Sequence, residues 1–72
     1  MKTQTERDIN DIFVNTVQLK QTANLLQHAV ETNDHHLQKI FLDRIKDLTK
    51  EIDQAVNRIE TRKQHRATWL KK

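Results

Sequence analysis

The 72-residue sequence contains no glycine, no proline, no cysteine and no serine. Glycine and proline form most tight turns, so a chain without either is expected to be helical where its apolar residues are suitably spaced. Without cysteine the chain has no disulfide, no thiol nucleophile and no cysteine-ligated metal. Without glycine it has no glycine-rich phosphate loop, and without serine no serine nucleophile. These absences exclude most catalytic and cofactor-binding motifs.

Long hydrophobic runs are absent as well. No apolar run approaches the roughly 20 residues that span a bilayer, and the N-terminus lacks the apolar core of a signal peptide. We therefore expect a soluble, cytoplasmic protein without membrane contact. Charged residues make up 32% of the chain and apolar residues 35%, a balance typical of exposed helices and coiled coils. Residues 1–72 are expected to form a single domain, and chains this small seldom build a self-sufficient core without association.

Apolar residues recur at three- and four-residue steps in two stretches of the chain. The first stripe comprises Ile9, Ile12, Phe13, Thr16, Leu19, Ala23, Leu26 and Val30, and the second comprises Leu37, Phe41, Ile45, Leu48, Ile52, Ala55, Val56 and Ile59. This spacing predicts helices over about 4–32 and 34–70, with the two stripes packed against each other. The fold class predicted is an all-α antiparallel two-helix hairpin. A single unbroken helix is the alternative, since the polar break over 31–35 has neither glycine nor proline.

Local signals mark the expected helix ends. Thr3 and Glu6 have the spacing of a capping box, which predicts the start of the first helix. Asn33 can enter the left-handed region that ends a helix, and Thr32, Asn33 or Asp34 can cap the second helix. A turn centred on Asn33 and Asp34 pairs residues whose numbers sum to about 67, and the two apolar stripes then begin and end together.

Several aliphatic residues widen the apolar surface beyond what one hairpin can bury. Val14, Val17 and Leu25 lie roughly opposite the first stripe, and Ile40 and Leu42 broaden the second. Such surface usually marks association, so we expect a four-helix bundle formed by dimerisation or by docking on a partner. The residues predicted for this protein-interaction surface are Val14, Val17, Leu25, Ile40, Leu42 and Val56. Alternatively, some of them are ordinary surface aliphatics.

The C-terminal part of the chain is strongly basic. Residues 58–72 carry six basic side chains and one acidic one, and we expect residues 60–72 to form a basic helical extension. The residues predicted for a basic patch are Arg58, Arg62, Lys63, Arg66 and Trp69. Arginines four residues apart repel each other unless something anionic meets them. We expect that anion to be a nucleic acid, RNA more than DNA, or an acidic protein surface. Otherwise the extension is only a solvated end. For Trp69 the alternative is packing on aliphatic side chains of its own chain or on a dimer mate.

Histidines and carboxylates give no convincing catalytic or metal site. His35 and His36 are adjacent in the chain and so point in different directions on a helix. We therefore expect these two histidines, together with His28 and Asp34, to be capping or solvated groups rather than metal ligands. The acidic residues of the second helix alternate with lysines, as on an exposed helix face. Because a hairpin supplies no pocket to shift a pKa, we expect no enzyme, no cofactor, no metal and no small-molecule substrate.

The sequence therefore favours a small non-enzymatic helical hairpin that acts by protein–protein binding. The expected roles are regulator, inhibitor or co-chaperone, a group that includes phage and plasmid types, with a second copy or a larger protein as partner. The alternative is a nucleic-acid-binding regulator that uses residues 58–72. The layout resembles that of the Rop hairpins, small dimers that bind paired RNA loops, in architecture alone.

Overall fold

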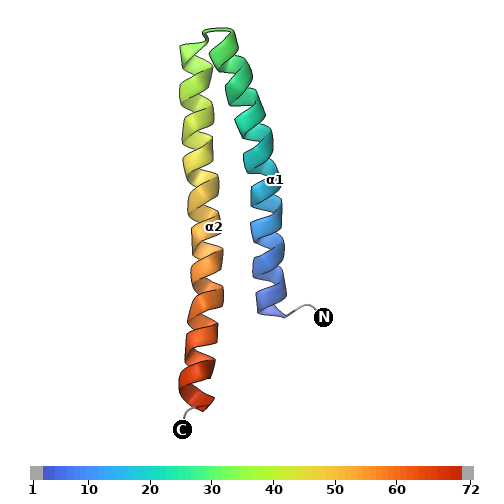
Figure 1. Cartoon of the computed structure of the whole chain (residues 1–72), viewed down its shortest axis with the longest axis vertical. Coiled ribbons are helices and arrows are strands. Elements are labelled where there is room, and N and C mark those ends of the chain that lie inside the picture. The colour runs from blue at the N-terminus through green and yellow to red at the C-terminus, as the bar shows by residue number, and fades with distance from the viewer. Residues whose placement is uncertain (1–2, 71–72) are drawn as a thin grey trace.

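The chain folds into two long antiparallel helices joined by a short turn. The computed structural model describes the backbone of residues 3–70 and the side chains of residues 3–63. Helix α1 spans Gln4–Glu31 and helix α2 spans His35–Leu70, and the two lie side by side in Figure 1. The predicted all-α hairpin is confirmed, and the single unbroken helix is excluded. Neither helix, over the residues described, is both long and apolar enough to cross a membrane.

Side chains close to the helix ends fix where each helix starts and stops. The hydroxyl of Thr3 accepts a hydrogen bond from the Glu6 amide at 3.1 Å, as expected of an N-cap. Asn33 adopts the left-handed conformation with φ of 57°, which is the geometry that ends α1. The Asp34 carboxylate then accepts a hydrogen bond from the Leu37 amide at 3.1 Å. Of the three residues predicted to cap α2, Asp34 supplies the cap.

The helices meet along a heptad seam. Apart from Gln18 and Val56 beside it, the buried and half-buried residues advance by alternate steps of three and four, the spacing of a coiled coil. On α1 they are Thr5, Asp8, Ile12, Asn15, Leu19, Thr22, Leu26 and Ala29, and on α2 with its cap they are Asp34, Gln38, Phe41, Ile45, Leu48, Ile52, Ala55, Ile59 and Arg62. The hydrogen bonds Arg62–Thr5 and Gln38–Ala29 join residues whose numbers sum to 67, in agreement with the predicted register.

Helix α1 is rotated about its axis relative to the expected packing. The predicted stripe placed Ile9 and Phe13 against α2, but their exposed fractions are 54% and 67%. Asp8 instead lies in the seam, with only 1% exposed. A single neighbouring helix covers only a narrow strip of the apolar arc, so the rest of the stripe faces outward. The predicted stripe is therefore divided between the seam and an open surface.

The hairpin is thin and its internal core is small. Its principal extents are 59, 23 and 12 Å, and the shortest is close to the diameter of one helix. Among the described residues, the fully buried apolar side chains are Ala29, Leu48 and Ala55. Two of these three are alanines, so most of the larger aliphatic side chains keep contact with solvent.

Candidate protein-interaction face

The seam separates two flanks that differ in chemistry. On one flank Arg44 donates to the side-chain oxygen of Gln18 at 3.2 Å, and a shallow hollow is lined by both helices, including Asp11, Glu51 and Arg58. Residues two positions apart lie about 200° apart around a helix. Ile9, two before Asp11, and Leu42, two before Arg44, therefore occupy the other flank. We call the first side the polar flank.

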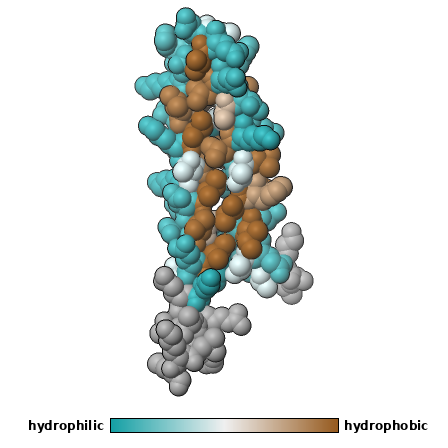
Figure 2. All heavy atoms as spheres, viewed as in Figure 1, coloured by the Kyte–Doolittle hydropathy of each residue, from teal (hydrophilic) through white to brown (hydrophobic). Residues whose placement is uncertain are grey.

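The second side forms an apolar face shared by both helices. Its exposed members are Ile9, Phe13, Val30 and Leu42, and its half-buried members are Ile12, Leu19, Leu26, Ile45, Ile52, Val56 and Ile59. Figure 2 shows a continuous hydrophobic band of this kind along the length of the described hairpin, bordered by hydrophilic residues on both sides. Apolar bands that run across two elements and remain open to water usually mark association.

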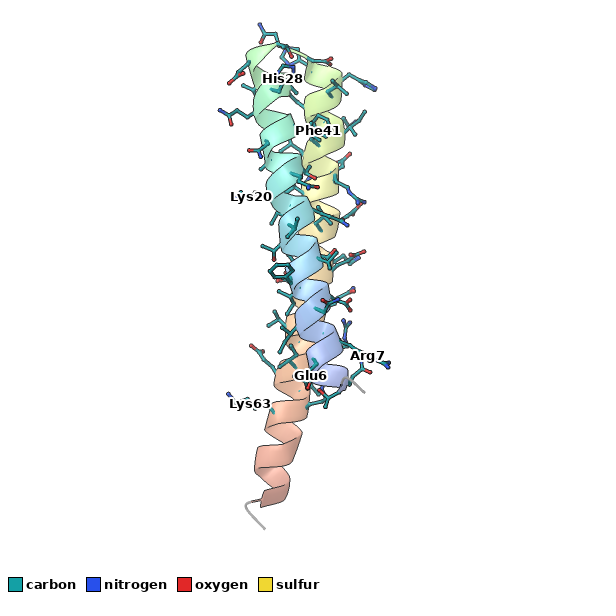
Figure 3. All side chains as sticks on the ribbon, turned by 90° about the vertical axis from the view of Figure 1, so that its right-hand side faces the viewer. Glu6, Arg7, Lys20, His28, Phe41 and Lys63 are labelled. Carbon is teal, nitrogen blue, oxygen red and sulfur yellow. The ribbon has the colours of Figure 1, made fainter. Side chains whose placement is uncertain are left out.

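The side view agrees with this division of the helix surfaces. Figure 3 is turned so that the face seen in Figure 2 lies at its left edge, and there it shows Lys20 and Lys63. Arg7 extends to the opposite edge, while Phe41 lies between the ribbons. Lys20 is one heptad after Phe13 and Lys63 is one heptad after Val56, so each shares a side with those apolar residues. The lysines thus lie beside the apolar face.

Two threonines interrupt the apolar face near its middle without adding unsatisfied polar groups. Thr16 lies between Ile9 and Ala23 in the seven-residue series of α1, and Thr49 lies between Leu42 and Val56 in that of α2. The Thr16 hydroxyl donates to the Ile12 carbonyl at 2.7 Å, and the Thr49 hydroxyl donates to the Ile45 carbonyl at 2.8 Å. Because each donor is satisfied inside its own helix, covering these positions leaves no donor unpaired.

A charged cluster, the Asp8 clasp, closes the open end of the hairpin. Arg58 Nε lies 3.0 Å from Asp8 Oδ1, and Arg62 Nη2 binds Asp8 Oδ2. Arg62 Nε also donates to the Thr5 hydroxyl at 3.2 Å. Both carboxylate oxygens are therefore paired by charged donors, as a buried carboxylate requires.

The clasp favours the ionised form of Asp8. Hydrogen bonding to Arg62 is the largest influence and lowers the pKa of the carboxyl below its ordinary value of 3.8. Burial acts in the opposite direction, and Arg58 lowers the pKa further through its own hydrogen bond and charge. The net shift is downward, so Asp8 is charged at neutral pH and holds both guanidinium groups.

The residues predicted for a protein-interaction surface lie on three different sides of the hairpin. Leu42 and Val56 belong to the apolar face. Three others lie on the polar flank. Val14 lines the hollow there. Leu25 is one heptad after Gln18 and Ile40 is two heptads before Gln54, so each shares the side of a residue on that flank. Val17, two residues from both Asn15 and Leu19, points away from α2. All but half-buried Val56 are exposed, but the structure does not bring the six together.

The predicted basic patch is partly occupied within the chain. Arg58 and Arg62 both bind Asp8, so the anion that meets them is a residue of α1. Lys63 is exposed, and it lines a small hollow with Thr5, Ile59 and Arg62. The side chains of Arg66 and Trp69 lie outside the described residues.

Sequence reasoning missed the two features that define this site. Asp8 lies outside every site predicted from the sequence, yet it binds partners 50 and 54 residues away. Ile9, Phe13 and Val30 were assigned to packing inside the hairpin. One signal in the sequence indicated which side of α1 faces α2. Asp8, Asn15, Thr22 and Ala29 are spaced by seven residues, so they continue the heptad seam through polar or small side chains. Comparison with protein families, curated proteins and solved structures finds no match to this chain.

Proposed function

We propose that the protein acts without catalysis, by binding helices of another polypeptide through its apolar face. The bound helices complete a four-helix bundle, as in a small regulator, inhibitor or co-chaperone. One observation carries the proposal: six large aliphatic residues of the seam remain half-buried on the side of the apolar face. They are Ile12, Leu19, Leu26, Ile45, Ile52 and Ile59.

The energetics of apolar burial support an intermolecular role for this face. Complete burial of a side chain such as Phe13 or Leu42 contributes about 1.5–3 kcal/mol relative to leaving it exposed. The hairpin's own contacts leave 67% of Phe13 and 47% of Leu42 exposed. A partner that covers the face gains this burial across both helices at once, and helices that present one apolar side to a neighbouring pair form the core of four-helix bundles.

The Asp8 clasp makes nucleic-acid binding the weaker proposal. A phosphate that takes either Arg58 or Arg62 must compete with the carboxylate that already binds them. Charge reversal at Arg66, which is not one of the residues that form the Asp8 clasp, distinguishes the two functions. Reversal abolishes nucleic-acid binding, whereas binding through the apolar face survives as long as the hairpin stays folded.

Photocrosslinking from single positions tests the proposed function. A benzophenone amino acid is placed at Phe13 on the apolar face, or at Val17 on the outward side of α1 as the matched control; both positions are exposed. In cells that naturally produce the protein, we expect irradiation to yield discrete protein adducts from position 13, few from position 17, and no change after nuclease treatment. Equal adducts from both positions, none from position 13, or loss after nuclease would contradict the proposal.

A further inference from the structure

Resting on the function proposed above, we infer that the apolar face is covered by a second copy of this chain, with the turns of the two hairpins at opposite ends. The two-fold axis that relates the copies then lies along the face, perpendicular to the helices, and passes over both Thr16 and Thr49. Two features lead to this arrangement. One is the symmetry of the apolar positions about those threonines, and the other is the order of the charges along the edges of the face.

The positions one heptad before and one heptad after the two threonines are apolar and symmetric about the proposed axis. Leu42 lies seven residues before Thr49, and Val56 lies seven after it. Ile9 and Ala23 are placed in the same way about Thr16. Rotation by 180° therefore lays Leu42 over Val56 of the second copy and Ile9 over its Ala23. Thr16 and Thr49 meet their own counterparts, where their internally bonded hydroxyls need no new partner.

Charged side chains along the edge of α2 are ordered along its length. Four exposed charged residues follow the outer edge of the apolar face on α2. Each lies three residues before a member of the seven-residue series that contains Leu42, Thr49 and Val56. They are Lys39, Lys46, Asp53 and Glu60. The lysines are therefore in the half close to the turn, and the carboxylates are in the half close to the open end. In the opposed arrangement Lys39 meets Glu60 of the second copy and Lys46 meets its Asp53. By symmetry each attraction occurs twice.

The same edges oppose a dimer with both turns at one end. There α2 of one copy lies beside α1 of the other, whose corresponding edge carries Glu6 and Lys20. Residues at equal level then bring Lys46 beside Lys20 and Glu60 beside Glu6, and each repulsion also occurs twice. Flanking charges of this kind determine the orientation of bundle helices. The charges thus favour opposed turns.

Charge substitution at Lys46 distinguishes the two arrangements. We expect the purified chain to form a reversible dimer in sedimentation equilibrium. Because Lys46→Glu turns two attractions into two repulsions, it should weaken the dimer roughly tenfold at low salt. The exchange variant Lys46→Glu/Asp53→Lys should restore the affinity. Lys50→Glu makes the same charge change on the outward side of α2 and should leave the affinity nearly unchanged. In the parallel dimer, Lys46→Glu would instead strengthen association.

Distance measurement gives a second test. The chain lacks cysteine, so His36→Cys provides a unique spin-label position near the turn. Opposed turns separate the two labels by on the order of 40 Å along the bundle, whereas turns at the same end leave them less than about 30 Å apart. A monomer at every concentration, or the shorter distance, overturns this inference. If position 13 still crosslinks to another protein, the proposed function survives without the dimer; no adduct at all refutes both.

Discussion

Asp8 joins the two helices at the end of the hairpin farthest from the turn. Its carboxylate accepts from Arg58 and from Arg62, and the side chain is almost wholly removed from solvent. A carboxylate in such a place tolerates few registers, because a shift of α2 along α1 leaves a buried charge unpaired. We therefore regard the clasp as a determinant of alignment between the helices.

Replacing Asp8 with asparagine should destabilise the hairpin clearly more than Asp11→Asn, which removes an exposed carboxylate from the same helix. The amide keeps the shape of the side chain but leaves the guanidinium groups without an anion. Urea denaturation followed by circular dichroism measures the difference. Equal midpoints for the two variants would show that the clasp has no effect on alignment or stability.

Acid should remove the same stabilisation. The pKa of Asp8 is lower in the folded chain than its ordinary value of 3.8, so the clasp contributes fully above that value. The contribution is lost as the pH falls through the folded pKa. The stability difference between the original chain and Asp8→Asn should therefore narrow below about pH 4. A difference that stays constant through this range would contradict the assignment.

At the scale of the elements, the turn depends on two adjacent residues with different roles. Asn33 takes the left-handed backbone that ends α1, and the Asp34 side chain begins α2. Asparagine enters the left-handed region more readily than most residues other than glycine. The turn therefore needs no glycine, which is how a chain without that residue reverses direction.

Substitution at Asn33 tests this account of the turn. Asn33→Val should cost roughly 1–2 kcal/mol, because a left-handed conformation places its Cβ too close to the following carbonyl. Asn33→Gly removes that conflict and should change the free energy of unfolding by much less. Thermal denaturation of the two variants at one protein concentration compares them. A valine variant as stable as the glycine variant would exclude a left-handed turn at this position.

At the scale of the whole molecule, the hairpin is only one helix thick in its shortest direction. Apart from Leu48, the fully buried residues described in the seam are alanines, an aspartate and a threonine, where a self-sufficient coiled coil would bury larger aliphatic side chains. Small chains of this kind usually gain stability from association. Stability and assembly should therefore be coupled.

Thermal stability should depend on protein concentration. If the folded state is the dimer, each tenfold rise in concentration stabilises it by about 1.4 kcal/mol per mole of dimer, so the denaturation temperature rises. Phe13→Glu on the apolar face should reduce both the temperature and its concentration dependence. Val17→Glu, on the outward side of α1, is the matched control. A denaturation temperature independent of concentration would mean that the hairpin is stable alone.

Most of the fold, but little of the site, follows from residues close together in the chain. The helix bounds, the Thr3 cap, the turn at Asn33 and the antiparallel register were predicted because propensity, capping and spacing act over a few residues. The predicted interaction surface included Leu42 and Val56 of the apolar face but omitted Ile9 and Phe13. An apolar arc wider than one neighbour can cover does not reveal which part is covered.

Composition, capping and spacing establish that the chain is helical, where it turns back, and that its apolar surface exceeds what one hairpin buries. Tertiary structure alone decided how each helix is rotated about its axis. That rotation places Asp8 in the seam with Arg58 and Arg62 and leaves Phe13 in solvent. The reason is physical: the rotation depends on contacts between residues far apart in the chain, such as Asp8 with Arg58 and Arg62, and the spacing of apolar residues alone does not identify those contacts.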